Sequence, residues 1–167
     1  PSTHTMVEYW IPTQNPYWAN CAEGVDECGV SNALQLSVGP SGQVWFTEWT
    51  ENKIGAVNTD AQVPLSVSAP EEITVSRGDS ADIRVDLVSQ SSLDVTMVSA
   101  GTFTSTGTLG DSTGIFSQQS VSVDSAGKQV SYVFTPAADL APGQYVLMLG
   151  ADQGDFAVLK AVRVNVV

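Results

Sequence analysis

Two cysteines, Cys21 and Cys28, bracket a short acidic segment and are the first residues whose spacing could do chemistry. A disulfide between them would close a small ring and stabilise the fold by roughly 2.5 kcal/mol on the chain-entropy model. Free or metal-bound thiols are the alternative, although two thiols without a second Cys or His pair make a poor zinc site. The spacing therefore favours a disulfide, which is typical of compartments outside the cytoplasm.

Three carboxylates, Glu23, Asp26 and Glu27, lie between the two cysteines. Calcium takes six to eight oxygen ligands, so these side chains are candidate Ca²⁺ ligands. The alternative is a solvated acidic loop, which the absence of EF-hand spacing favours. We expect no other cofactor.

The remaining chemical groups have simpler interpretations. His4 is the only histidine and matches no catalytic motif. Arg77-Gly78-Asp79 spells an adhesion tripeptide but falls where a turn between two strands needs glycine. Asp152 and Asp155 fit a turn between strands first and a cation site second.

The charge balance excludes whole classes of partner. The 167 residues include 18 acidic and 6 basic ones, for a net charge of -12. Such a chain repels nucleic acid phosphates and anionic lipid surfaces. No apolar run approaches the roughly 20 residues that a bilayer span requires, so we expect neither nucleic acid binding nor membrane insertion.

Residues 63–167 have the pattern of a β-sandwich. In Ala81–Ser89, Ile83, Val85 and Leu87 alternate with charged residues, which predicts a strand with one apolar face and one solvent-exposed face. The stretch 101–117 is rich in Gly, Ser and Thr and suggests an irregular connection or weak edge strands. The predicted strands are 64–69, 72–76, 81–89, 93–98, 121–123, 129–135, 144–149 and 158–167.

The segment Asp139–Tyr145, DLAPGQY, places a Leu, a Pro-Gly turn and a Tyr before a strand. It resembles the corner that enters a late strand of immunoglobulin-like and fibronectin-like sandwiches. The resemblance implies an Ig-like sandwich over residues 63–167 and says little about ligands.

Residues 1–62 contain all four tryptophans and predict a separate unit. Its expected strands are 6–12, 33–38, 43–49 and 53–58, joined by turns at 39–42 and 50–52 into a four-stranded antiparallel sheet. The string LSVGPSGQVWFTEWTENKIGAVNT, together with VEYWIPT at 7–13, resembles one blade of the virginiamycin B (streptogramin B) lyase-like β-propellers. The expected fold class is therefore all-β, a four-stranded blade-like sheet followed by an Ig-like sandwich.

A single blade is apolar on both faces, because in a propeller a neighbouring blade covers each side. We expect Trp10, Trp45, Phe46 and Trp49 to form an interface. The sandwich would cover one face, and a second copy, another protein chain or missing blades would cover the other. The partner expected is therefore the chain itself or another protein.

Enzymes of the lyase family use a histidine base and a divalent metal held by carboxylates. His4 does not match that motif, and Glu48, which stands in the WFTE strand, is expected to be a structural hydrogen-bonding residue. The leading hypothesis is a non-enzymatic extracellular or cell-surface module that associates through its blade-like sheet. The alternative is the carboxy-terminal fragment of a secreted lyase-like propeller enzyme. The acidic, Lys-poor style also resembles exported proteins of saline habitats and archaeal envelopes.

Reduction of the predicted Cys21–Cys28 bond should lower the free energy of unfolding by roughly 2.5 kcal/mol, because the unfolded chain regains the entropy of the open ring. Urea denaturation with and without reductant measures the difference. Equal stability in both conditions, together with alkylation of both thiols in the absence of reductant, would show that the bond is absent.

Overall fold

The protein is all-β, as its sequence predicts. The computed structural model describes residues 4–11, 31–101 and 109–167, and these form thirteen strands and one short 3-10 helix. The chain folds into two compact units, one made of residues 1–9 and 64–167, the other of residues 10–63. Within the described residues, no helix is long and apolar enough to cross a membrane.

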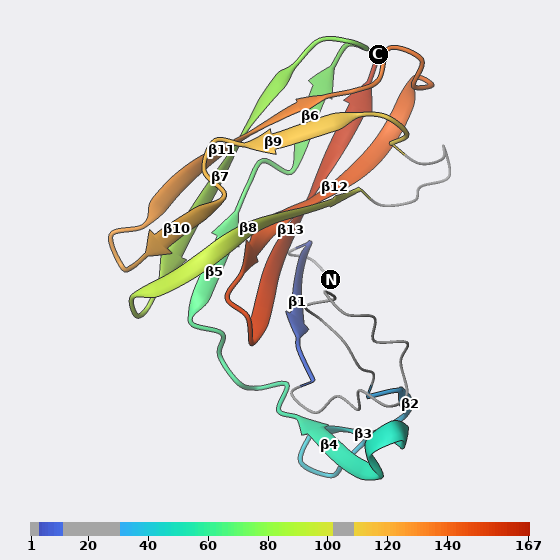
Figure 1. Ribbon diagram of the computed structural model, residues 1–167, viewed down its shortest axis with the longest axis vertical. Coiled ribbons are helices and arrows are strands. Elements are labelled where there is room, and N and C mark those ends of the chain that lie inside the picture. Colours follow the sequence, from blue (N-terminus) through green and yellow to red (C-terminus); the bar gives the residue numbers. More distant parts are fainter. Residues whose placement is uncertain (1–3, 12–30, 102–108) are drawn as a thin grey trace, which may run out of the picture. The chain divides into compact units, whose positions relative to one another are not determined.

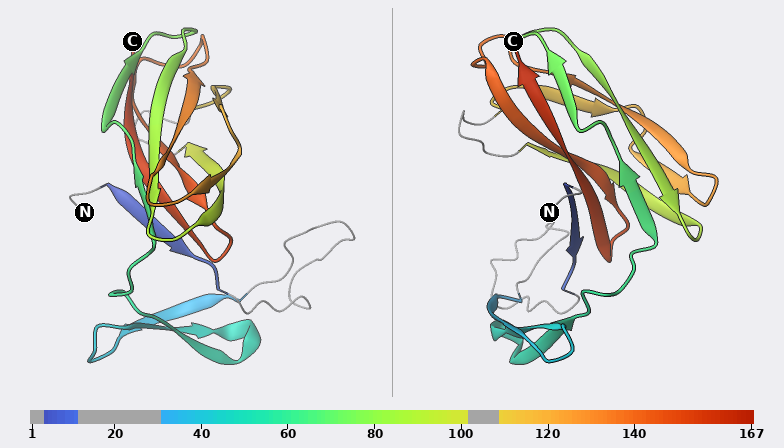
Figure 2. Two further views of the ribbon diagram at one scale, coloured as in Figure 1. Left: turned by 90° about the vertical axis from the view of Figure 1, so that its left-hand side faces the viewer. Right: turned by 180° about the vertical axis from the view of Figure 1, so that it is seen from behind.

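The first unit is a β-sandwich of two sheets (Figures 1 and 2). One sheet has the order β5-β7-β11-β9, and the other β1-β13-β12-β8-β10, with β6 also pairing with β13. The strands of the first sheet are β5 (Leu65–Ser68), β7 (Ala81–Ser89), β11 (Lys128–Thr135) and β9 (Thr113–Phe116). Those of the second are β1 (Thr5–Tyr9), β13 (Phe156–Val166), β12 (Gly143–Asp152), β8 (Leu93–Gly101), β10 (Ser120–Val123) and β6 (Glu72–Val75).

The order β5-β7-β11-β9 opposite β8-β12-β13 matches that of an immunoglobulin-like sandwich, in which strands A, B, E and D face strands C, F and G, and β1, β6 and β10 are additional. Strand β6 runs parallel to β13, whereas the other pairings are antiparallel. Between β8 and β11 the chain visits both sheets, because β9 pairs with β11 and β10 pairs with β8. Strand β9 lies inside the stretch 101–117, of which residues 102–108 are outside the described part of the chain.

The core follows the predicted alternation. On β7, Ile83, Val85 and Leu87 are fully buried while Asp82 and Arg84 are exposed. Facing residues from the second sheet, such as Tyr145 and Val162, are equally buried. Period-two alternation therefore assigned the inner face of these strands correctly.

The first strand, β1, does not belong where the sequence placed it. It was expected in the sheet of residues 1–62, but it pairs with β13 along its whole length, from Thr5↔Lys160 to Tyr9↔Phe156. The segment before Trp10 therefore belongs to the same unit as the sandwich strands. Alternation specifies a strand but not its partner, which explains the error.

The second unit contains a three-stranded antiparallel sheet in its described residues, where four strands were expected. Its strands are β2 (Ala33–Val38), β3 (Val44–Glu48) and β4 (Lys53–Val57). Turns join them as predicted: Gly42 has φ +81 between β2 and β3, and Asn52 has φ +52 after the 3-10 helix Trp49–Glu51. A register shift between Ala33 and Leu36 marks a bulge in β2.

A tyrosine corner closes one end of the sandwich, as the Asp139–Tyr145 segment implies. Tyr145 is 1% exposed, and its hydroxyl donates to the carbonyl oxygen of Ala141 at 2.8 Å. The adjacent Leu140 is also buried, and its N–H donates to the Ala137 carbonyl oxygen at 3.1 Å. The first bond attaches the loop before β12 to the strand itself, and the second closes a turn within that loop.

Replacing Tyr145 with Phe should lower the free energy of unfolding by about 1–2 kcal/mol, since it deletes a bond to a backbone carbonyl and adds no bulk. Urea denaturation followed by circular dichroism measures the change. Tyr9→Phe is the control, because Tyr9 is 45% exposed and should unfold like the wild type. Equal loss in both variants would contradict a structural role for the corner.

Candidate interaction surface

The register of the three-stranded sheet defines its two faces. Directly opposite residues share a face, so Val44, Phe46 and Glu48 of β3 lie on one face, and Trp45 and Thr47 on the other. The first face continues over Leu36 and Val38 of β2 and over Gly55 and Val57 of β4. The second continues over Ser37, Ile54 and Ala56. Apolar side chains thus occupy both faces.

On the first face the ring of Phe46 lies over Gly55, its direct partner on β4. A Cβ added at Gly55 would collide with the Phe46 ring and stand 2.8 Å from Glu48 Oε1. An aromatic ring over a strand glycine covers backbone that would otherwise be exposed. This contact joins the WFTE segment of β3 to the glycine of NKIG on β4. Phe46 is consequently half-buried by its own sheet.

Glu48 ends the same strand and is 6% exposed. It takes part in interactions within the protein, and its side chain lies beside Gly55. A buried, partnered carboxylate at the end of a strand fits the structural role that the sequence favours.

On the second face the indole of Trp45 lies against the turn that joins β2 to β3. A Cβ at Gly39 would stand 2.8 Å from Trp45 Nε1, so only glycine leaves room for the ring there. The Gly39 N–H donates to the Gln43 carbonyl oxygen at 2.9 Å and fixes the turn. Trp45 remains 42% exposed despite this contact.

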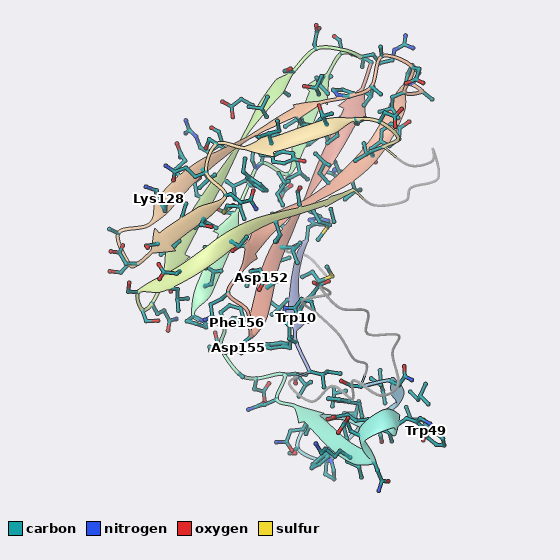
Figure 3. All side chains as sticks on the ribbon, in the orientation of Figure 1. Trp10, Trp49, Lys128, Asp152, Asp155 and Phe156 are labelled. Atoms are coloured by element: carbon teal, nitrogen blue, oxygen red, sulfur yellow. The ribbon has the colours of Figure 1, made fainter. Side chains whose placement is uncertain are left out.

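Most apolar side chains of the sheet are exposed. Leu36 and Val38 are each 73% exposed on the first face, and Ile54 is 70% exposed on the second. Trp49, labelled in Figure 3, extends from the 3-10 helix. It is 65% exposed, and Leu34 on β2 is 63% exposed. We call these five residues together with Trp45 the apolar surface of the sheet.

The structure places the four predicted interface residues in different settings. Trp45 and Trp49 belong to the apolar surface, and Trp10, which directly follows β1, is 47% exposed. Phe46 packs on Gly55 instead. Sequence reasoning missed the aliphatic residues Leu34, Leu36, Val38 and Ile54, which the alternation in β2 and β4 could have revealed.

The other predicted sites are turns or lie outside the described residues. Gly78 has φ +77 in the turn between β6 and β7, which supports the structural interpretation of Arg77-Gly78-Asp79. Asp152 Oδ1 accepts a bond from the Gly154 N–H at 2.7 Å, in the turn between β12 and β13 near Asp155 (Figure 3). The predicted disulfide Cys21–Cys28 and the candidate calcium ligands Glu23, Asp26 and Glu27 all fall between residues 12 and 30, outside the described part.

Within residues 4–11, 31–101 and 109–167, no three His, Cys, Asp or Glu side chains are grouped so that they could hold a metal ion. His4 has an exposed side chain, and its carbonyl oxygen accepts a bond from the Ala161 N–H at 2.8 Å. Its backbone is therefore part of the sandwich edge.

No protein-family model matches the sequence, and no curated protein matches it significantly. Among solved structures, domains 4 and 5 of the S-layer protein SbsC are similar with a TM-score of 0.44 and 18% identity, covering 76% of this chain and 66% of that one. A family 123 glycoside hydrolase from Clostridium perfringens is similar with a TM-score of 0.48 and 10% identity, covering 62% of this chain and 27% of that one. Both scores are below 0.5, so neither likeness bears on function.

Replacing Gly55 with Val should destabilise the second unit by about 1–3 kcal/mol, because the side chain would displace the Phe46 ring. All four tryptophans lie in this unit, so tryptophan fluorescence during urea unfolding reports on it. Ala56→Val is the matched control, since Ala56 is the next residue of β4 and is exposed. A Gly55→Val protein as stable as the control would contradict the packing of Phe46 on Gly55.

Proposed function

We propose that the chain is a non-enzymatic extracellular or cell-surface β-module that associates through its three-stranded sheet with itself or with another protein chain. The exposure of apolar side chains on both faces of that sheet carries the proposal. Leu36 and Val38 on one face and Ile54 on the other each have at least 70% of their surface exposed.

Covering the exposed apolar side chains of the sheet would be energetically favourable. Fully burying one Leu, Ile or Val side chain in an interface stabilises the complex by about 1.5–3 kcal/mol. Burying several of them would therefore contribute more to binding than the surrounding weak polar contacts. Contiguous exposed apolar patches on soluble proteins typically mark interaction sites. The two tryptophans of the apolar surface, Trp45 and Trp49, belong to a residue type enriched at binding hot spots. The sheet is therefore best suited to bind the surface of another protein.

The extracellular location is supported by the sequence. The predicted Cys21–Cys28 bond would persist only in an oxidising compartment. A net charge of -12 with only 6 basic residues favours solubility and disfavours contact with nucleic acid. A structural role also fits a chain with a single histidine.

A second candidate function is the fragment hypothesis. The antiparallel order β2-β3-β4 and the contact of Phe46 with Gly55 would suit one blade of a lyase-like propeller whose further blades cover both faces. The coding sequence upstream of Pro1 distinguishes the two. Several more WFTE-like repeats with histidines would favour the enzyme, whereas a signal peptide directly before Pro1 would exclude it.

Self-association predicts that the wild-type chain has a mass above its 17.6 kDa monomer in size-exclusion chromatography with light scattering. The double variant Leu36→Glu/Ile54→Glu should have a lower mass than the wild type at the same concentration, because it places one charge on each face of the sheet. Both positions are exposed, so the fold should tolerate the change.

Ile115→Glu is the control, since Ile115 is 71% exposed but lies on β9 of the sandwich. Its mass should equal that of the wild type. A wild-type chain that stays at 17.6 kDa up to about 1 mM would contradict self-association and leave only a different partner chain.

A further inference from the structure

The edge of β13 is shared between two strands that come from different parts of the chain. Parallel β6 covers Arg163–Val166, and antiparallel β1 covers Phe156–Lys160. Strand β6 is fixed by side chains as well, because Glu72 forms an ion pair with Arg163 at 3.3 Å and accepts a bond from Asn165. The segment 156–160 is thus a slot of defined length that accepts one short antiparallel strand.

The slot lies beside a well-packed part of the sandwich. Ala157, Val158 and Leu159 are 4%, 2% and 5% exposed, so residues pointing to both faces of β13 are buried here. An open edge at this position would leave backbone N–H and C=O groups unpaired next to apolar side chains, and such groups cost free energy when they lack partners. The slot therefore needs an occupant.

The present occupant, β1, pairs with β13 through its backbone and has only partly buried side chains. Met6, Val7 and Tyr9 keep 41%, 36% and 45% of their surface exposed, and no side chain of β1 is fully buried. Segments with few buried apolar contacts open at low free-energy cost, without global unfolding. Strand β1 can therefore leave the slot while the rest of the sandwich stays folded, and the cost of its lost main-chain bonds is recovered when another strand takes its place.

The connection between β1 and the rest of the sandwich is long. After Tyr9 the chain forms the whole second unit, residues 10–63, before it returns to the sandwich at Pro64. A flexible tether confers an effective concentration in the millimolar range, and a second copy has to approach that concentration to compete. A second copy at comparable concentration offers the same strand with the same backbone hydrogen bonds.

We propose that the slot at Phe156–Lys160 is a strand-addition site whose second occupant is β1 of another copy of this chain, so that two copies exchange their first strands. This site is separate from the apolar surface of the sheet, and the inference does not depend on the proposed function. Reciprocal exchange of an identical element is a low-cost route to a dimer, because each copy regains the bonds that it gives up.

The test uses disulfide formation across the register. The bond from the Ala161 N–H to the His4 carbonyl oxygen sets the alternation, which makes Tyr9↔Phe156 a non-hydrogen-bonded pair with close Cα atoms. Chains of all 167 residues, one carrying Tyr9→Cys and the other Phe156→Cys, with different tags, are mixed at about 10 μM and about 1 mM and oxidised. Mass spectrometry of the non-reduced digest identifies the 9–156 link apart from the native cysteines.

Exchange predicts a 9–156 link between chains, with a yield that rises severalfold over this concentration range. Glu8→Cys with Phe156→Cys is the matched control, because Glu8 pairs with Ala157 and lies on the other face. Adding Glu8→Pro to the Tyr9→Cys chain removes an N–H that bonds to β13 and should lower the yield about fivefold, the loss expected for one backbone hydrogen bond.

A chain with both cysteines forms the 9–156 link internally if the register is right. An internal link without any link between chains at about 1 mM would overturn the proposal, and so would a control pair that links equally well. Repeating the mixture in the Leu36→Glu/Ile54→Glu background separates the two surfaces. Exchange should persist there, and its loss would assign the association to the sheet instead.

Discussion

The sandwich depends on the pairing of the β13 backbone along both of its edges. On one edge β12 pairs with β13 from Gly143↔Val166 to Asp152↔Ala157. On the other, β6 and β1 divide the strand between them. Buried backbone N–H and C=O groups need hydrogen-bond partners. Among the described residues, no single strand pairs with the whole of the β13 edge opposite β12. Strands β1 and β6, which the second unit separates in the sequence, therefore share this edge of β13.

This arrangement makes the second unit an insertion into the sandwich. The chain contributes β1, leaves the sandwich to form residues 10–63, and then supplies the remaining strands. The sandwich is consequently discontinuous in sequence, and its first strand is anchored by few buried side chains. A strand at such an edge combines weak side-chain anchoring with a full set of main-chain bonds, the condition under which strand exchange is inexpensive.

In the second unit, the sheet of three strands covers only part of its own backbone and apolar side chains. Phe46 covers Gly55 on one face, and Trp45 covers Gly39 at the turn on the other. These contacts bury part of the surface of the two aromatic rings, whereas the aliphatic side chains Leu36 and Ile54 stay exposed. A sheet of this size cannot bury two apolar faces by itself, because each face needs a second layer to pack against.

Local sequence patterns determined much of this protein. The alternation in Ala81–Ser89 indicated both the bounds and the inner face of β7, and Gly78 marked its turn through the need for a positive φ. The Asp139–Tyr145 segment indicated the corner in which Tyr145 bonds to Ala141. Such features depend on neighbours a few residues apart, so the sequence carries them directly.

Only the tertiary structure decided which strands became partners. Nothing in the local pattern indicated that Thr5–Tyr9 would pair with β13, about 150 residues away along the chain. The composition of the stretch 101–117 allowed either an irregular connection or weak edge strands, and the tertiary structure made Thr113–Phe116 the edge strand β9. The pattern also left open that Phe46 would pack on Gly55 and that Leu36 and Ile54 would be more exposed than the ring. A strand's own residues specify its extension and its two faces, whereas its partner is selected by long-range packing and by the edge that remains unpaired.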